Sequence, residues 1–341
     1  MKIAVLAGGF SPEREVSRTS GALVARALVE NGHRVCLLDP YLGRAETPPD
    51  LSDLFLREPP EMPEAVGGVP DLEALRARSG NGEVLIGANV AEICRYADAV
   101  FLALHGGAGE NGQLQAFLDL YHVPYTGSGY GGSLLAMNKD LAKSLFRGAN
   151  VPTPAWTLCG RATRAEEVIA AVGLPCVLKP ADGGSSVGVR FAETEDELQS
   201  ALTVGAGRSR LLAETKITGR ELTVGILGER VLPPVEIRPK QGFYDYRNKY
   251  AGDTEEICPA PIPAKVAARL SEYARRAFRA LGLRGYARLD FLLDAEDRLW
   301  CLEANTLPGM TPTSLFPLEA ATVGISYHAL CEILIRMAID R

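Results

Sequence analysis

The first part of the chain alternates short apolar runs with segments of helical spacing. Residues 3–7 (IAVLA) form an apolar run that ends at two glycines, and residues 16–31 then carry apolar side chains at helical intervals. A second apolar run follows at 34–39 (RVCLLD), and the rhythm resumes with a strand at 99–104 and a helix near 113–121. Strands that alternate with helices predict a parallel sheet covered by helices.

A second α/β unit follows the segment Asn150-Val-Pro-Thr-Pro154. A helix predicted over 134–149 precedes this segment, and its two prolines mark a domain boundary. Residues 43–82 and 239–256 have the composition of irregular segments, the first with a short helix. The chain of 341 residues is long enough for two or three domains. The other predicted elements are helices at 163–172, 195–204 (with a Thr194–Glu197 capping box) and 263–281, and strands at 176–179, 187–191, 211–214, 221–227 and 231–237.

The charge and cysteine content exclude several classes of protein. The formal net charge is −6 without a Lys/Arg cluster, which argues against nucleic acid or an anionic membrane as the main partner. No apolar run approaches the ~20 residues of a membrane-spanning helix. The seven cysteines are scattered, odd in number and without a C-x-x-C pair. Free buried thiols in a reducing cytoplasm are therefore expected.

Two strands near the C-terminus carry a candidate metal site. Residues 286–293 and 298–304 are apolar runs, and a two-residue turn between them would pair Asp290 with Glu303. Because strand side chains alternate, Asn305 would share their patch. Hard oxygen ligands without His or Cys suit Mg²⁺ or Mn²⁺. A surface hairpin with ordinary acidic residues remains the alternative.

Two glycine-rich segments are candidate phosphate sites. Residues 179–188 (KPADGGSSVG) lie between two strands, and their free N–H groups and Lys179 suit an anion, although a tight β-hairpin is the alternative. Residues 127–132 match G-x-G-x-x-G, the pattern of a dinucleotide-binding dehydrogenase. They do not follow the first strand, and no strand ending in an acid comes about 20 residues later, so this alternative is disfavoured.

Together these segments resemble the ATP-grasp superfamily, and within it the D-alanine–D-alanine ligase family. The resemblance implies an α/β fold of three domains: an N-terminal parallel-sheet domain (1–134), a central lobe (135–220) and a C-terminal lobe (221–341), the two lobes clamping ATP. Its motifs occur in the family's order and cover nearly the whole chain: AGGFSPEREVS (7–17), LALHGGAGENGQLQ (102–115), PYTGSG (124–129), KPADGGSSVGV (179–189), FYDYRNKY (243–250), ARLDF (287–291) and LEANTLPGMTPTSLFP (302–317).

The resemblance also implies the nucleotide and metal contacts. Asp290, Glu303 and Asn305 match the family's ligands for two Mg²⁺ or Mn²⁺ ions, which bridge the phosphates of ATP. The implied nucleotide contacts are Lys139, Lys179 and Lys249 at the phosphates, Glu214, Thr215 and Ile217 at the adenine, Glu221 at the ribose and Phe243 near the nucleotide.

The first D-alanine would be held by Glu13, which matches the carboxylate that binds its ammonium group. Ser185 and Tyr250 match the hydrogen-bonded partners that close a loop over the site. Arg288 and the N–H of Gly309 resemble the donors that stabilise the tetrahedral intermediate. A solvated Glu13 and a merely packed aromatic loop at 243–250 are the alternatives.

The second D-alanine would be held by its carboxylate. Ser314 and the Leu315 N–H match this grip, and His105 matches a histidine near the same substrate. A core histidine is the alternative for His105. Asn111 and Asn138 replace the family's usual aspartates, which leaves the second-substrate preference open.

The implied reaction is the ATP-dependent ligation of two D-alanines in the cytoplasm through an acyl phosphate, for peptidoglycan synthesis. The 239–256 segment is expected to close as a lid, since an acyl phosphate hydrolyses in water. The alternatives are a ligase that takes D-serine or D-lactate second, the dehydrogenase, and a non-enzymatic amino-acid-binding protein. A homodimer is implied by resemblance alone.

Overall fold

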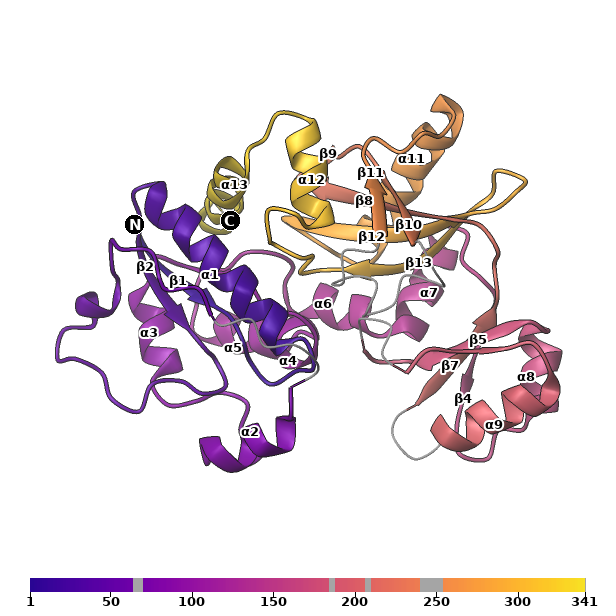
Figure 1. Cartoon of the computed structure of the whole chain (residues 1–341), viewed down its shortest axis with the longest axis horizontal. Helices are drawn as coiled ribbons and strands as arrows, with labels where there is room; N and C mark the ends of the chain where they lie inside the picture. The colour runs from indigo at the N-terminus through magenta and orange to yellow at the C-terminus, as the bar shows by residue number, and fades with distance from the viewer. Residues whose placement is uncertain (64–69, 184–187, 206–209, 240–253, 341) are drawn as a thin grey trace.

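The computed structural model describes residues 1–63, 70–183, 188–205, 210–239 and 254–340. In these residues the chain forms a parallel sheet and two antiparallel sheets, each with its own helices (Figure 1). The mixed α/β architecture predicted from the sequence is confirmed. The domain boundaries themselves stay a prediction.

The first sheet has the order β2-β1-β3 with all strands parallel. The central strand β1 (Lys2–Leu6) is buried from Ile3 onward, because helices cover both faces. Its neighbours are β2 (Arg34–Leu38) and β3 (Ala99–Leu102). The surrounding helical segments are α1 (Arg14–Glu30), η1 (Leu51–Leu54), α2 (Leu72–Ser79), α3 (Val90–Tyr96), α4 (Gly107–Glu110) and α5 (Gln113–Leu120).

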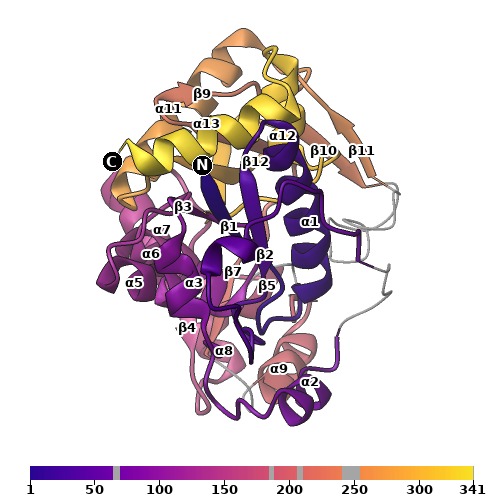
Figure 2. The ribbon, with the colours of Figure 1, turned by 90° about the vertical axis from the view of Figure 1, so that its left-hand side faces the viewer.

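The end of the chain returns to this first sheet. Helix α12 (Leu315–Thr322) leads into α13 (Tyr327–Ile339), which packs beside α1 and places Leu330 and Leu334 in the same core as β1 (Figure 2). His33 on the first domain bonds Glu332 of α13 at 2.7 Å. No single helix among the described residues is long and apolar enough to cross a membrane, although α12 and α13 meet that criterion as a pair bent by 102°.

The second sheet is antiparallel with the order β4-β7-β5-β6. The predicted capping box is confirmed, because Thr194 Oγ1 accepts the Glu197 N–H at 3.3 Å and the Glu197 carboxylate accepts the Thr194 N–H at 3.2 Å. The elements of this lobe are β4 (Trp156–Cys159), α8 (Ala165–Val172), β5 (Cys176–Pro180), β6 (Arg190–Ala192), α9 (Glu195–Gly205) and β7 (Leu211–Thr215).

The third sheet is antiparallel with the order β11-β10-β8-β12-β13, and β9 pairs with β8. Helix α11 (Ala264–Ala280) covers one face, where Val224 and Leu289 join its apolar core. The strands are β8 (Arg220–Leu227), β9 (Arg230–Val231), β10 (Val235–Pro239), β11 (Thr254–Ile257), β12 (Tyr286–Leu293) and β13 (Leu299–Asn305).

Three sequence predictions need correction. The helix predicted at 134–149 is two helices, α6 (Tyr130–Met137) and α7 (Lys139–Gly148), because the Asn138 side chain accepts the Leu141 N–H and starts a new helix. The strand predicted at 231–237 is split into β9 and β10, since two prolines (233–234) interrupt it. The segment predicted to be irregular at 239–256 ends in strand β11, which pairs with β10, and helix α3 was not predicted.

The cysteines agree with the prediction of free thiols. All seven are unpaired, six are buried, and Cys258 is partly exposed.

Candidate active site

The hairpin of β12 and β13 carries the predicted metal ligands. Asp290 pairs with Glu303 across the hairpin, as predicted. The predicted two-residue turn is wrong, however. The Asp294 N–H donates to the Arg298 carbonyl at 3.0 Å, and Asp297 adopts a φ of 57°, so the loop comprises residues 295–297.

A β-bulge in β13 restores the predicted pairing at the site. The register shifts by one residue next to Asp290, where Leu302 is the extra residue. Before the bulge Cys301 faces the apolar core under α11, and after it Ala304 does. A one-residue shift moves every following side chain to the other face of a sheet. The bulge therefore turns the side chains of Glu303 and Asn305 away from the core, toward the face of Asp290.

The Asp290 carboxylate is surrounded by hydrogen-bond donors. Its Oδ1 accepts from Arg288 Nε at 3.0 Å and from the Thr223 hydroxyl at 2.6 Å. Its Oδ2 accepts from Arg288 Nη2 at 3.0 Å and from Asn305 Nδ2 at 2.9 Å. A carboxylate has about four lone-pair sites, so these donors fill it.

The oxygen ligands fit a hard divalent cation. Asp290, Glu303 and Asn305 present two carboxylates and one amide on one sheet face, a donor set typical of Mg²⁺ or Mn²⁺. No group of three or more His, Cys, Asp and Glu side chains arranged for a metal occurs in the part of the chain that is described. The third oxygen donor of this set is therefore the Asn305 amide, and the set has none of the His or Cys ligands typical of zinc.

A pocket of about 310 Å³ adjoins these ligands. Its lining includes Glu110, Lys139, Gly183, Glu303 and Asn305. Lys139 begins α7, and its ammonium lies 3.3 Å from the Glu303 carboxylate and donates to the Gly183 carbonyl. The predicted phosphate lysine thus lies between the glycine-rich segment and the predicted metal ligands.

A buried charge cluster lies between the second sheet and helix α7. Lys179 on β5 and Lys143 on α7 contact the Glu214 carboxylate at 2.6 and 2.9 Å. Burial alone would raise the pKa of Glu214, but the two ammonium groups outweigh it and lower the pKa. Burial lowers the pKa of Lys143 to about 8, against the attraction of Glu214. The carboxylate predicted to contact adenine is therefore held by two lysines.

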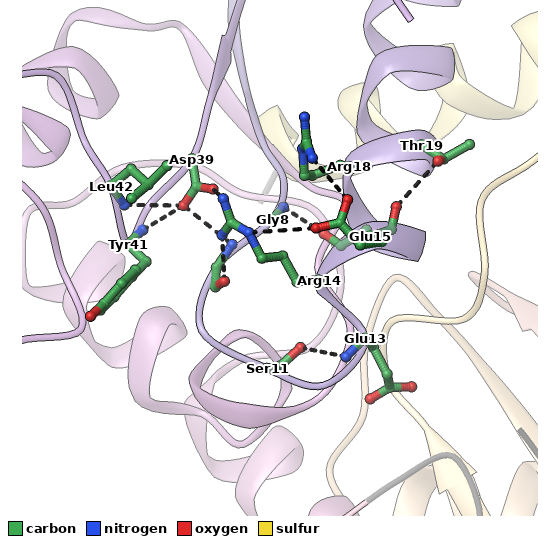
Figure 3. A network of polar contacts seen from close by, with 12 residues as sticks. Gly8, Ser11, Glu13, Arg14, Glu15, Arg18, Thr19, Asp39, Tyr41 and Leu42 are labelled. Atoms are coloured by element: carbon green, nitrogen blue, oxygen red, sulfur yellow. Dashed lines mark hydrogen bonds and ion pairs between the residues drawn. The ribbon is translucent and has the colours of Figure 1, made fainter. Parts of the chain in front are cut away.

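The loop between β1 and α1 presents Glu13. Arg14, which follows it, is buried and donates to the Gly9 carbonyl at 2.7 Å, while its other amino group pairs with Asp39 at 2.5 Å. Figure 3 shows the Glu13 carboxylate pointing away from this pair. A Cβ on Gly106 would lie 2.3 Å from Glu13 Oε2, which places the carboxylate against the loop after β3.

His105 and Glu110 join the first domain to the end of β13. His105 Nδ1 lies 3.1 Å from the Leu307 carbonyl, and Glu110 accepts the Leu307 N–H at 3.3 Å and the Gly106 N–H at 3.0 Å. Burial lowers the pKa of His105 despite the nearby Glu13. Burial, followed by the charge of Glu13, raises the pKa of Glu110 to about 7. His105 is thus a buried, hydrogen-bonded histidine close to Glu13.

The predicted grip on a second substrate lies at the start of α12. A Cβ on Gly309 would lie 2.8 Å from Ser314 Oγ, so the two residues are adjacent. Ser314 is the N-cap of α12, and its hydroxyl bonds the Thr311 hydroxyl at 2.8 Å instead of capping the helix. Leu315 follows with a buried side chain. The helix N-terminus is therefore not capped by its own serine.

The other predicted site residues are placed as follows. The Thr215 hydroxyl donates to the Val172 carbonyl at 2.7 Å, and Ile217 lies between β7 and β8. Glu221 is two residues before Thr223 on β8 and so shares its face. Four predicted residues lie outside the described part of the chain: Ser185, Phe243, Lys249 and Tyr250.

The G-x-G-x-x-G segment at 127–132 is a packing feature. A Cβ on Gly132 would lie 3.0 Å from the Gly282 carbonyl, and one on Gly127 would lie 3.2 Å from Leu307. The glycines allow α6 to approach the C-terminal lobe closely. This contact provides no support for a dinucleotide site.

Sequence reasoning missed several residues of the site. Lys143 lies four residues after Lys139, which places both on one helix face and was a usable signal. Asp39 directly follows a buried strand, a common position for a functional or structural carboxylate. Thr223 and Glu110 had no distinguishing local pattern.

These elements define a class of fold. A lobe with buried lysines faces an oxygen-bearing hairpin across a charged pocket, beside a parallel-sheet domain, which is the ATP-grasp architecture. Residues 2–128 match the family model for the D-ala D-ala ligase N-terminus, and residues 145–336 match that for its C-terminus. The chain therefore belongs to the D-alanine–D-alanine ligase family.

Individual relatives agree over the full length. The chain is 40% identical to the D-alanine–D-alanine ligase of Pediococcus pentosaceus, covering 97% of this chain and 96% of the relative. It is also 40% identical to that of Oleidesulfovibrio alaskensis, with 99% and 97% covered. A solved D-alanine–D-alanine ligase from Bacillus anthracis complexed with ATP is similar with a TM-score of 0.76 and 27% identity, covering 100% of this chain and 97% of that one.

Proposed function

We propose that the chain is an ATP-dependent ligase that joins two D-alanines to D-alanyl-D-alanine, a precursor for the cell wall. ATP phosphorylates the carboxylate of the first D-alanine, the amine of the second attacks the acyl phosphate, and inorganic phosphate leaves. The observation that carries the proposal is the placement of Asp290, Glu303 and Asn305 on one face beside Lys139, in a chain similar to such ligases over its full length. Relatives named for D-alanine as both substrates favour it over D-serine or D-lactate here.

Asp290, Glu303 and Asn305 would hold two Mg²⁺ or Mn²⁺ ions. Such ions neutralise the charge of the transferring phosphoryl group and orient the ATP phosphates. Lys139 and Lys179 add positive charge, and both are nearly buried, where charge acts over a lower dielectric. Lys249 would add a further contact, with Glu214, Thr215, Ile217, Glu221 and Phe243 around the adenine and ribose.

Glu13 would bind the ammonium group of the first D-alanine. Its position against Gly106 leaves the carboxylate at the junction between the first domain and the C-terminal lobe. Ser185 and Tyr250 would complete its hydrogen-bonded group. An ammonium recognised by a fixed carboxylate forms a charge-assisted hydrogen bond, which explains a preference for amino acids.

The second half-reaction would use the segment that follows β13. Arg288 and the Gly309 N–H would stabilise the negative charge of the tetrahedral intermediate. The uncapped N-terminus of α12 offers the Leu315 N–H and the Ser314 hydroxyl to the carboxylate of the second D-alanine, which His105 would adjoin. These donors are pre-positioned by the Gly309–Ser314 contact.

We also propose a homodimer in a reducing cytoplasm. Helices α5 and α6, with the residue that follows α5, expose four large apolar side chains, which suit a protein partner better than water: Leu120, Tyr121, Tyr130 and Leu134. The seven free thiols suit a reducing compartment. Light scattering of Leu120→Glu is expected to show a smaller molecular mass than the unsubstituted protein. An equal mass would contradict the proposal that this surface is the dimer interface.

Phosphate release from MgATP tests the catalytic proposal. D-alanine, D-serine, D-lactate and L-alanine are offered singly and in pairs, and the products are separated by chromatography. We expect phosphate release with D-alanine and formation of the D-alanine dipeptide. Absence of D-alanine-dependent release would overturn the proposal.

A further inference from the structure

Helix α12 carries a buried carboxyl group that the proposed mechanism does not use. Glu319 is fully buried, and its Oε1 accepts the Gly225 N–H at 3.0 Å. Its Oε2 has no hydrogen-bond partner among the described residues. A buried oxygen without a donor is costly, so its presence calls for an explanation. Burial raises the pKa of Glu319 well above its usual value. The largest effect that lowers this pKa is the positive charge of Arg288.

The Glu319 carboxyl lies where a side chain of residue 225 would be. A Cβ on Gly225 would lie 2.2 Å from Glu319 Oε2. Gly225 is the cross-strand partner of Arg288, and its own N–H and carbonyl bond Glu319 and Leu232, so they point away from β12. In such a non-hydrogen-bonded pair the facing side chains lie closest together. Glu319 thus takes the position directly across the sheet from Arg288.

Arg288 is hydrogen-bonded to the carboxylate of Asp290, which is the predicted ligand of the divalent ion. Two of the four donors around Asp290 are Arg288 nitrogens, at 3.0 Å each, and the other two are neutral groups. A cation cannot reach a filled carboxylate unless a donor leaves. The guanidinium is the donor that a divalent ion repels, so Arg288 is the group that must move.

We propose that Glu319 receives Arg288 when Asp290 binds the divalent ion. Glu319 is then a positioning residue: its unpartnered oxygen lies at the Cβ position of Gly225, the cross-strand partner of Arg288, and offers the guanidinium a second anchor. Two other titratable groups, Glu256 on β11 and His105, are also close enough to Arg288 for its charge to affect their pKa values. Neither takes the place of Glu319, because Glu256 is on an edge strand and His105 already bonds the Leu307 carbonyl. The inference rests on the proposed role of Asp290 as a metal ligand.

Binding of Mn²⁺ tests this exchange without measuring turnover. Free Mn²⁺ is followed by electron paramagnetic resonance in the presence of ADP. When Arg288 arrives, the Glu319 carboxyl releases its proton to solvent and becomes the anion that holds the guanidinium. Glu319→Gln keeps an acceptor for the Gly225 N–H but cannot form this anion, and we expect its Mn²⁺ dissociation constant to rise about tenfold, because the state in which Asp290 is available is populated less. Thr322→Ala, on the exposed side of α12, is the matched control and should bind like the unsubstituted protein.

A double-mutant cycle separates the exchange from a general effect of charge. In an Arg288→Met background no guanidinium has to leave Asp290, so Glu319→Gln should change Mn²⁺ binding by less than about twofold. An equal loss in both backgrounds, or no loss in the single variant, would overturn the proposal. If the unsubstituted protein binds Mn²⁺ no better than Glu303→Gln, the metal site itself fails.

The complex with Mn²⁺ and ADP gives a second measurement that does not depend on a substitution. In its crystal structure we expect an Arg288 nitrogen about 2.8 Å from Glu319 Oε2, the length of a charge-assisted bond. Arg288 still bidentate on Asp290 beside a bound ion would contradict the exchange.

Discussion

Asp39 is expected to control how Glu13 is presented to the first substrate. One carboxylate oxygen accepts the N–H groups of Gly9, Tyr41 and Leu42 at 3.3, 2.9 and 3.1 Å, and the other pairs with Arg14 at 2.5 Å. The pair ties the end of β2 to the loop before α1. Figure 3 shows this network beside the loop that carries Glu13.

The size of the effect follows from burial. Arg14 is 6% exposed, so Asp39→Ala leaves a buried guanidinium with only the more distant Glu15 carboxylate, at 3.9 Å, as an ion-pair partner and should cost about 3 kcal/mol of unfolding free energy. Asp39→Asn keeps the oxygen that accepts the three N–H groups and loses only the charge, which should cost about 1.5–3 kcal/mol. Since domains are stable by about 5–15 kcal/mol, the Asn variant should fold and suit kinetics.

Steady-state kinetics of Asp39→Asn test the positioning role. We expect the KM for the first D-alanine to rise about tenfold, whereas the KM for ATP stays unchanged, because the predicted nucleotide contacts among the described residues lie outside the first sheet and its helices. Arg18→Met is the control, since this partly exposed arginine on α1 pairs only with Glu15 in the described contacts. Equal changes in both KM values, or unfolding in urea with unchanged free energy, would refute the reasoning.

Three further substitutions test other parts of the site. Deleting Leu302 removes the bulge and should abolish D-alanine-dependent phosphate release, and a fully active deletion variant would contradict the role of the bulge. Lys143→Met leaves Glu214 with one ammonium group and should lower the unfolding free energy, measured in urea, by about 3 kcal/mol. An unchanged unfolding free energy would contradict the idea that this charge cluster stabilises the fold. The pKa of Glu110 is raised to about 7, so the folded protein holds a proton that the unfolded chain releases from about pH 4.5. Its contribution to stability should therefore fall as pH rises between these values, and urea titrations of Glu110→Gln should lack this slope.

The hairpin shows what strand alternation can and cannot predict. Alternation correctly placed Asp290, Glu303 and Asn305 on one face. The turn was predicted one residue too short, and the bulge at Leu302 was missed, and these two errors cancel at the site. The bulge depends on how β13 packs under α11, which local sequence does not reveal.

Other features depended on contacts between distant segments. The βαβ rhythm predicted the first sheet, because buried parallel strands are apolar throughout. The packing of α13 against that sheet was not predicted, because the apolar face of a helix does not indicate which sheet it will cover. The sequence around Glu319 did not predict a role for this residue either, because the role depends on its position next to Gly225 and Arg288, which lie on other strands. The roles given to Ser185 and Tyr250 stay predictions.

Isotope transfer tests the central claim that the carboxylate of the first D-alanine is phosphorylated. D-alanine labelled with oxygen-18 in its carboxylate is incubated with MgATP and the enzyme, and the released phosphate is examined by mass spectrometry. An acyl phosphate passes one carboxylate oxygen to phosphate when the second amine attacks, so each phosphate should carry one labelled oxygen. Phosphate without label, formed alongside the dipeptide, would contradict the account.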